Sequence, residues 1–151
     1  MKGVIGVGNP FKGDDGIGVK LIEETRESFA SEGVQIFEVG SDTFEILHIL
    51  KDLEAAIIVD AVRFGGEPGD YRFFTSDDVE SLKGSETAHA TNIIEVLNLS
   101  DKLDESPERV LIMGVQPKDT NLGEEFSPPV KKRIPELVEI LQEKIESFFS
   151  L

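Results

Sequence analysis

Val4-Ile5-Gly6-Val7-Gly8-Asn9-Pro10-Phe11-Lys12-Gly13-Asp14-Asp15-Gly16-Ile17-Gly18-Val19 is the stretch that decides the fold. Its apolar beginning is typical of a buried strand, and its glycine-rich middle is typical of a turn that leads into a helix. A nucleotide-binding protein would hold phosphate in such a turn. Here the turn ends in two adjacent carboxylates, which repel phosphate, so the sequence favours a cation at this point.

The known phosphate-binding patterns do not fit this turn. Gly6 and Gly8 could begin a dinucleotide fingerprint, but its third glycine would fall at Phe11, and no Gly-Lys-Ser/Thr follows for a P-loop. The formal charge of the chain is −15, which disfavours polyanionic nucleic acid and anionic membranes as partners. We therefore expect no nucleic-acid partner and no membrane partner.

The composition limits the chemistry further. The chain contains no cysteine, which removes disulfides, thiolate catalysis and thiolate metal sites together. Its 151 residues suit one domain over 1–151, and a hydrophobic fraction of 39% is ordinary for a globular protein. No signal-sequence pattern opens the chain, and no apolar stretch is long enough to cross a bilayer. We expect a cytoplasmic monomer.

Apolar runs alternate with amphipathic stretches along the chain. We expect strands at 3–7, 34–39, 55–59, 71–75 and 109–115, and helices at 15–30, 43–50 and 91–99, followed by a long helix from Pro128 to the C-terminus. Residues 76–88 and 117–129 are expected to be loops, with Ser127 as the cap of the last helix. The turn cluster at 65–69 leaves few residues before the next strand, which favours an antiparallel orientation for it.

This order predicts an α/β fold: a twisted, mostly parallel five-stranded sheet with helices on both faces and one antiparallel strand. In such sheets, ligands bind beyond the carboxyl ends of the strands, near a switch in strand order. Asp14 and Asp15 follow the first strand, and Asp60 follows the third. If those strands are neighbours, the carboxylates converge on one crevice.

Asp14 and Asp15 have two interpretations. They can cap the following helix, where the dipole favours negative charge, or they can ligate a metal, and the motif alone divides evenly between these roles. Capping by Asp14 would leave Asp15 available as a ligand. Gly16 and Gly18 each cost about 1 kcal/mol relative to alanine inside a helix. Their presence in the first turn indicates that something approaches the backbone closely there.

Asp60 comes directly after a buried strand, where a lone charge is costly to desolvate. A hydrogen-bonded turn aspartate is the simpler explanation, but the strand-end position favours function. His89 precedes a helix and, considered alone, is best explained as a surface or capping histidine. His48 is the other histidine of the chain. It lies mid-helix among apolar residues, and we assign it no role.

Asp15, Asp60 and His89 together form a set of oxygen and nitrogen donors that suits divalent zinc, nickel, manganese or iron. Three protein ligands leave coordination positions open for a substrate. A pair of aspartates, Asp15 and Asp60, sharing one proton is the competing hypothesis, although the alternating pattern does not suggest an aspartic protease. No Gly-x-Ser-x-Gly elbow supports a serine triad.

Five ordered segments stand out along the chain: Gly6-x-Gly8-Asn9-x-x-x-x-Asp14-Asp15-Gly16-x-Gly18, Val39 to Thr43 before Glu45-Ile46-Leu47, Asp60-Ala61 through Pro68-Gly69, His89 with Glu95-Val96-Leu97, and Gly114-Val115-Gln116-Pro117 with Ser127-Pro128. In these segments, and so over nearly its whole length, the chain resembles the hydrogenase maturation endopeptidases. Ser41, Asp42 and Thr87 stand where other residues are frequent in the family. None of these departures touches the proposed ligands.

The resemblance implies an endopeptidase that removes the C-terminal extension from the precursor of a nickel–iron hydrogenase large subunit. It implies Asp15, Asp60 and His89 as nickel ligands and catalytic residues, with Asn9 and Asp14 as groups that support the ligands or orient the substrate. Nickel would arrive in the precursor, whose cysteines are softer and stronger ligands than carboxylates. Another divalent metal could occupy the site in vitro. The alternatives are a non-catalytic metal-dependent chaperone and a small-molecule metallohydrolase on the same fold.

Overall fold

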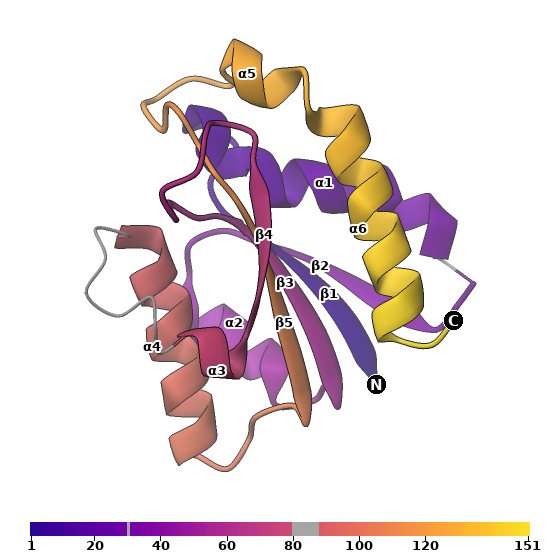
Figure 1. Cartoon of the computed structure of the whole chain (residues 1–151). Helices are drawn as coiled ribbons and strands as arrows, with labels where there is room; N and C mark the ends of the chain where they lie inside the picture. Colours follow the sequence, from indigo (N-terminus) through magenta and orange to yellow (C-terminus); the bar gives the residue numbers. More distant parts are fainter. Residues whose placement is uncertain (30, 80–87) are drawn as a thin grey trace.

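A computed structural model describes residues 1–29, 31–79 and 88–151, and at residues 76, 79 and 88–92 it describes the backbone alone. Five strands form one sheet in the order β2-β1-β3-β5-β4 (Figure 1). The strands are β1 Lys2–Val7, β2 Val34–Val39, β3 Ala55–Ala61, β4 Tyr71–Thr75 and β5 Arg109–Val115. Neighbouring strands are parallel except for β4 and β5, which are antiparallel. The predicted fold class is therefore confirmed, including the orientation of β4.

The strand order reverses at β1, which pairs with β2 on one side and with β3 on the other. This is the switch point at which ligands bind in open α/β sheets. The sequence places the end of the third strand at Val59, but β3 continues to Ala61. Asp60 therefore lies within the strand, opposite Gly114 of β5, and the prediction that it follows the strand is wrong.

The bounds of the helices agree with the prediction in α2, Thr43–Leu50, where one amphipathic pattern runs without interruption. The helices are η1 Gly13–Gly16, α1 Ile17–Thr25, η2 Arg26–Phe29, α2 Thr43–Leu50, α3 Ser76–Val79, α4 Ala88–Lys102, α5 Pro128–Lys131 and α6 Ile134–Phe148, with η for 3-10 helix. Only α2 has the expected bounds. The region expected to be loop after β4 begins with α3, and α4 is longer than predicted at both ends.

Two predicted helices are divided in the structure. The helix expected at 15–30 consists of α1 between two 3-10 turns, because the Gly-Asp-Asp-Gly segment winds more tightly than an α-helix. The expected C-terminal helix is broken between α5 and α6. Pro135 lies in the first turn of α6. It has no N–H to donate to the carbonyl of Lys131, so one continuous helix cannot form.

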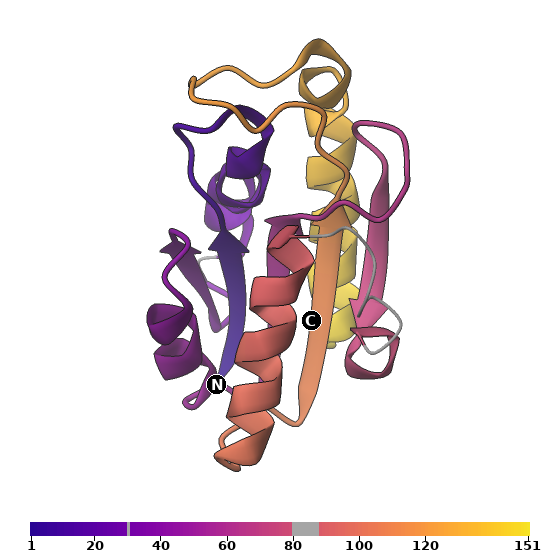
Figure 2. The same cartoon turned by 90° about the vertical axis from the view of Figure 1, so that its left-hand side faces the viewer.

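Helices cover both faces of the sheet, as Figure 2 shows from the side. Consecutive strand residues point to opposite faces. On one face Val4 and Ile57 pack with apolar side chains of α1 and α6, and on the other Ile5 and Ile58 pack with α2 and α4. All residues of β3 are buried, as expected for a central strand covered on both sides.

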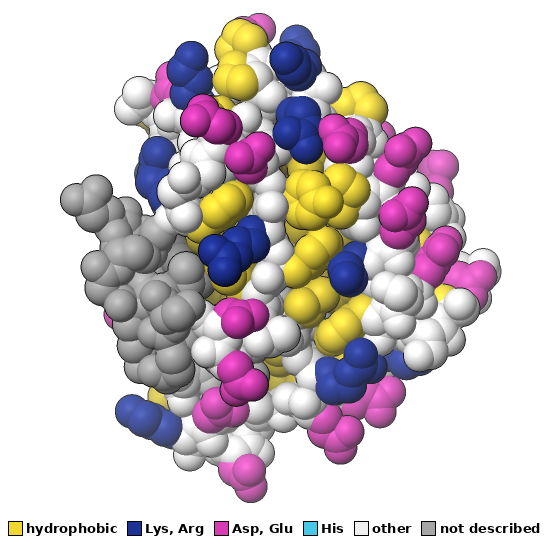
Figure 3. Space-filling view, viewed as in Figure 1, with side chains coloured by type: hydrophobic (Ala, Val, Ile, Leu, Met, Phe, Trp, Pro, Cys, Tyr) yellow, Lys and Arg dark blue, Asp and Glu magenta, His cyan; other side chains and the backbone are white. Residues whose placement is uncertain are grey.

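Apolar side chains gather near the centre of the face seen in Figure 3, with charged side chains around them. Cations cover aromatic rings of β4 and α6: the Nζ of Lys144 lies 4.5 Å from the ring centre of Phe73, and the guanidinium of Arg109 lies 4.2 Å from that of Phe148. Such cation–π contacts shield apolar surface from water. Among the described residues, no helix has the length and apolar character that a membrane span requires.

Candidate active site

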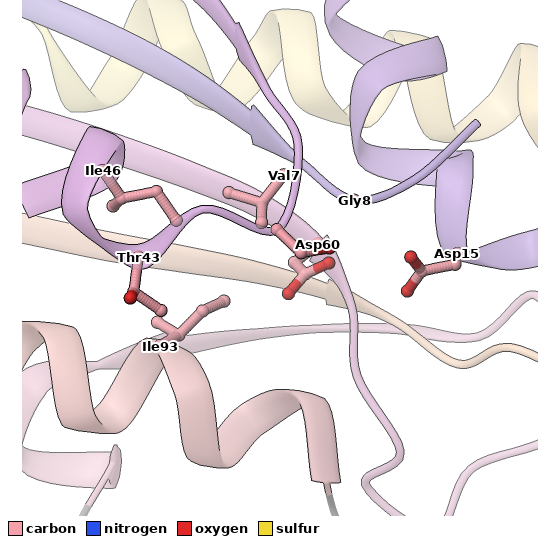
Figure 4. Close-up of a pocket in the computed structure, with 8 residues that line it drawn as sticks. Val7, Gly8, Asp15, Thr43, Ile46, Asp60 and Ile93 are labelled. Carbon is pink, nitrogen blue, oxygen red and sulfur yellow. The ribbon is translucent and has the colours of Figure 1, made fainter. Parts of the chain in front are cut away.

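A small cavity opens at the carboxyl edge of β1 and β3. It is lined by Val7, Gly8, Asp15, Ser41, Thr43, Ile46, Asp60 and Ile93. Figure 4 shows the carboxylates of Asp15 and Asp60 entering it from different elements, η1 and β3. The cavity has a volume of about 20 Å³, which is room for roughly one water-sized group. The expected convergence of these two aspartates on one crevice is confirmed.

Asp15 is held rigidly by the turn that precedes it. Its side chain is buried, and its Oδ2 accepts a hydrogen bond of 2.8 Å from the backbone N–H of Asn9. The side-chain Oδ1 of Asn9 accepts in turn from the N–H of Phe11. Gly8 has φ +134°, and a Cβ there would lie 2.0 Å from the carbonyl oxygen of Asp15. Only glycine can therefore occupy this position without moving Asp15.

Asp60 is buried in β3 and its Oδ1 accepts a 2.8 Å hydrogen bond from the N–H of Ala61. Burial raises the pKa of Asp60 well above its usual value, the negative charge of Asp15 raises it further, and the bond from Ala61 opposes the rise. A proton or a cation must therefore accompany this pair of carboxylates. Both a cation site and a proton-sharing pair of aspartates have this property.

Asp14 does not cap a helix, contrary to the sequence-based interpretation. The N-cap residue of α1 is Gly16, and no side chain bonds to the exposed N–H groups there. The carboxylate of Asp14 is instead buried against the segment 117–127. Its Oδ2 accepts from Lys118 N at 2.8 Å and Asp119 N at 3.0 Å.

Ser127 completes the set of donors around Asp14. Its N–H donates to Oδ1 at 2.8 Å and its Oγ donates to Oδ2 at 2.7 Å. Burial alone would raise the pKa of Asp14, but the bonds from Asp119, Ser127 and Lys118 together lower it below its usual value. Ser127 is the N-cap residue of α5 as predicted, yet its hydroxyl makes no capping bond because it is bonded to Asp14.

Backbone hydrogen bonds extend this connection between the two loops. Gly13 N donates to Gly123 O at 2.7 Å, Gly123 N donates to Phe11 O at 2.8 Å, and Asp14 N donates to Asp119 O at 2.8 Å. The segment 117–127 is thereby fixed to the turn that carries Asp15. No local pattern in the sequence indicates this contact, because the turn that contains Asp14 and the segment 117–127 are more than a hundred residues apart along the chain.

Gly16 and Gly18 serve internal packing rather than the approach of another molecule. A Cβ at Gly18 would lie 2.2 Å from the carbonyl oxygen of Val59 and 2.7 Å from that of Val7. A Cβ at Gly16 would lie 2.8 Å from the Cα of Pro10. The close approach expected at this turn is therefore that of α1 to β1 and β3.

His89 lies in the first turn of α4, and its side chain lies outside the described residues. Ile93, four residues later in the same helix, lines the cavity. Positions four apart lie on the same face of a helix. His48 is exposed on α2. Among the side chains that the structure describes, no three of His, Cys, Asp or Glu lie close enough together to hold a metal.

Gln116 supports the loop that follows Asp60, a role that the sequence-based reasoning did not assign to it. It is buried directly after β5, and its Oε1 accepts from Phe64 N at 2.9 Å and Gly66 N at 3.2 Å. These bonds fix the loop that follows β3 and Asp60. The available signal was a polar residue at the end of a continuous apolar strand, the same signal that singled out Asp60.

The sequence pattern of the hydrogenase maturation protease family (HycI) matches residues 19–144. The chain belongs to this family. The matched range includes Asp60 and His89, whereas Asp15 precedes it. The chain is 29% identical over 141 residues to the hydrogenase expression/formation protein HupD of Bradyrhizobium diazoefficiens, covering 91% of this chain and 73% of HupD. It is 32% identical to the coenzyme F420 hydrogenase subunit delta of Methanothermobacter thermautotrophicus, over 94% of this chain and 92% of that protein.

Solved structures of family members have the same fold. The hydrogenase maturating endopeptidase HybD of Escherichia coli superposes with a TM-score of 0.80 at 25% identity, covering 97% of this chain and 94% of HybD. The [NiFe] hydrogenase maturation protease HycI of Thermococcus kodakarensis gives a TM-score of 0.70 at 28% identity, covering 94% and 90%. The family and the fold expected from the sequence are both confirmed.

Proposed function

We propose that this protein is an endopeptidase that removes the C-terminal extension from the precursor of a nickel–iron hydrogenase large subunit, in a step that depends on nickel. Family membership supports the reaction class. The observation that carries the proposal is the pair of buried carboxylates, Asp15 and Asp60, in a cavity with room for one ion at the switch point of the sheet. Two buried carboxylates in so small a cavity favour a cation, because an organic ligand would not fit between them.

The residues fit nickel as part of the substrate. Two buried carboxylates supply hard oxygen donors and negative charge, and His89 on α4 supplies an imidazole of the kind nickel accepts. Such a set, without thiolate, binds nickel more weakly than cysteines do. Nickel can therefore stay with the precursor while Asp15, Asp60 and His89 contact it. Another divalent metal can fill the same positions in vitro.

When bound, the metal supplies Lewis-acid chemistry to an oxygen of the scissile peptide or of a water molecule. The chain's own residues do the positioning. The N–H of Asn9 holds Asp15, and the N–H of Ala61 holds Asp60. Burial and the charge of Asp15 raise the pKa of Asp60 and so disfavour its ionised form, which a neighbouring cation would favour. Asp14 fixes the segment 117–127 to the turn that carries Asp15.

The volume of the cavity favours a macromolecular substrate over a small one. The described residues leave about 20 Å³ between the two aspartates, so a substrate must lie outside and present only one group to them. A precursor chain that carries its own metal meets this condition, and a small-molecule metallohydrolase site does not follow from it. We further propose that the protein acts as a cytoplasmic monomer with one domain.

The experiment mixes the protein with a nickel-loaded large-subunit precursor and measures loss of the extension by mass spectrometry. We expect cleavage by the parent and none by Asp60→Ala. Asp52→Ala, which removes an exposed carboxylate near α2, is the matched control and should cleave like the parent. Equal cleavage by Asp60→Ala would overturn the site assignment. Stable precursor binding without cleavage by the parent would support the chaperone alternative instead.

A further inference from the structure

A second cavity lies between α2 and α4, next to the one that holds the aspartates. This α2–α4 groove is lined by Thr43, Phe44, Leu47, Glu95, Val96 and Leu99, and its volume is about 130 Å³. The lining is apolar except for Thr43 and Glu95. Its volume exceeds that of the aspartate cavity, and it has room for a side chain rather than an ion.

Two large apolar side chains of the groove are exposed. Phe44 is 77% exposed in the first turn of α2, and Leu99 is 42% exposed on α4. On the opposite face of the sheet, Lys144 and Arg109 cover the aromatic rings of Phe73 and Phe148. No cation–π contact is found at Phe44 among the described residues. Single exposed apolar side chains are ordinary, but apolar side chains that gather at a cavity are a feature of binding surfaces.

The groove is continuous with the proposed active site. Thr43 lines both cavities. On α2, Ile46 lines the aspartate cavity and the next residue, Leu47, lines the groove. The rise from Thr43 to Leu47 along the helix is about 6 Å, and an extended peptide covers that length with about two residues. A chain whose cleaved bond lies at the aspartates therefore reaches the groove within a few residues.

We propose that the α2–α4 groove binds an apolar side chain of the hydrogenase precursor, located within about three residues of the cleaved bond. The inference rests on the proposed function. A volume of about 130 Å³ fits one side chain, whereas a second folded copy would need a contact area of about 1,000 Å² or more. Glu95 on the wall disfavours an acidic residue at that position of the precursor by charge repulsion.

Two charged substitutions test the groove without disturbing the core. Phe44→Asp places an acid in the first turn of α2, where the helix dipole favours it, and Leu99→Glu changes a half-exposed position of α4. Leu103→Glu is the matched control, because Leu103 is 49% exposed one turn beyond Leu99 and does not line the groove. Both groove variants should raise KM for the nickel-loaded precursor roughly 10- to 100-fold, with kcat little changed. Leu103→Glu should match the parent.

A change in the precursor identifies the occupant. Replacing the apolar residue nearest the cleaved bond with Ala should raise KM for the parent protein, and should add little to the effect of Leu99→Glu, because both changes remove the same contact. Groove variants that match the parent in KM and in precursor binding would overturn the groove proposal while the endopeptidase stands. If the parent protein binds the precursor without cutting it, the endopeptidase proposal fails. The groove proposal is then tested by the dissociation constants of the precursor complexes, which should be higher for the two groove variants than for the parent. If the parent does neither, both proposals fail.

Discussion

The carboxylate of Asp15 faces the same small cavity as that of Asp60, and its negative charge adds to the rise in the pKa of Asp60 (Figure 4). One aspartate comes from a 3-10 turn and the other from the middle of the sheet. Pairing of β1 with β3 brings them together. The fold thus places two acids where burial already disfavours ionisation, and this destabilises the folded chain unless a proton or cation compensates.

Asp60→Asn should therefore stabilise the protein while abolishing precursor cleavage. Asparagine keeps an oxygen that can accept the bond from Ala61, and it replaces a carboxyl whose ionised form is disfavoured by burial and by Asp15. We expect the free energy of unfolding at pH 7 to rise, because the substitution removes the cost of placing an ionisable carboxyl in this buried position. Urea denaturation of metal-free protein measures this change. Asp52→Asn, at an exposed position, should change it little.

The carboxyl of Asp60 should also make the stability of the folded chain depend on pH in a defined direction. Because the pKa of Asp60 is raised in the folded state, the folded chain keeps a proton that the unfolded chain loses above about pH 4. The stability contributed by this group is fully present below the unfolded pKa and is lost as pH rises through the folded pKa. The difference in stability between Asp60→Asn and the parent should therefore grow with pH over this window. A difference that does not depend on pH would contradict the raised pKa.

Asp14→Asn should act in the opposite direction. The carboxylate accepts four hydrogen bonds, and an amide cannot accept all of them because its nitrogen is a donor. We expect a loss of about 2–4 kcal/mol at pH 7, since hydrogen bonds to charged groups are worth about 1.5–3 kcal/mol. The pKa of Asp14 is lowered in the folded state, so its contribution is present above the unfolded pKa and is lost as pH falls through the folded pKa.

Urea denaturation at pH 7 and near pH 3 measures the effect of Asp14→Asn, and hydrogen exchange locates it in segment 117–127. Asp119→Asn is the matched control, because Asp119 is exposed in that segment and its side chain accepts only a local bond from Asn121 in the described structure. Equal effects of the two substitutions would show that Asp14 does not anchor the loop.

The strands were predictable because their information is local. Continuous apolar runs such as 109–115 can be read directly as strands buried on both faces, and their alternation with helices implies the parallel sheet. The predicted end of the third strand is wrong because the residue at that position is polar in the sequence but buried in the structure. The charge of Asp60 interrupts the apolar run and predicts a strand end at Val59, although the strand continues through Asp60 to Ala61.

The roles of Asp14 and Gly18 depend on contacts that no local pattern contains. The partners of Asp14 lie beyond β5, far along the chain, so neighbouring residues indicate helix capping or metal ligation but not an anchor for that distant segment. Gly18 approaches the carbonyl of Val59, which becomes a neighbour only after β3 has joined the sheet. The place of Asp15 in the cavity beside Asp60 is predictable, because it follows from the position of Asp15 after β1 and from the pairing of β1 with β3.

Gly18→Ala should be strongly destabilising because α1 lies against the sheet at this residue. The added Cβ would lie 2.2 Å from the backbone oxygen of Val59, and the backbone cannot yield as a flexible side chain would. We expect a loss of about 2–4 kcal/mol, at the upper end of the cost of overpacking, measured by thermal denaturation. Gly40→Ala is the control, since a Cβ there meets no atom within 4 Å. A mild effect of Gly18→Ala would contradict the tight packing of α1.

The two histidines provide an internal comparison for the metal site. His89→Ala should weaken nickel binding to the isolated protein at least tenfold, because it removes the imidazole proposed to complete the set with Asp15 and Asp60. His48→Ala, on the exposed face of α2, should leave binding unchanged. Isothermal titration calorimetry in two buffers also reports proton release, which we expect because metal ligands bind in their deprotonated forms. Loss of binding in both histidine variants, or in neither, would rule out His89 as the specific ligand.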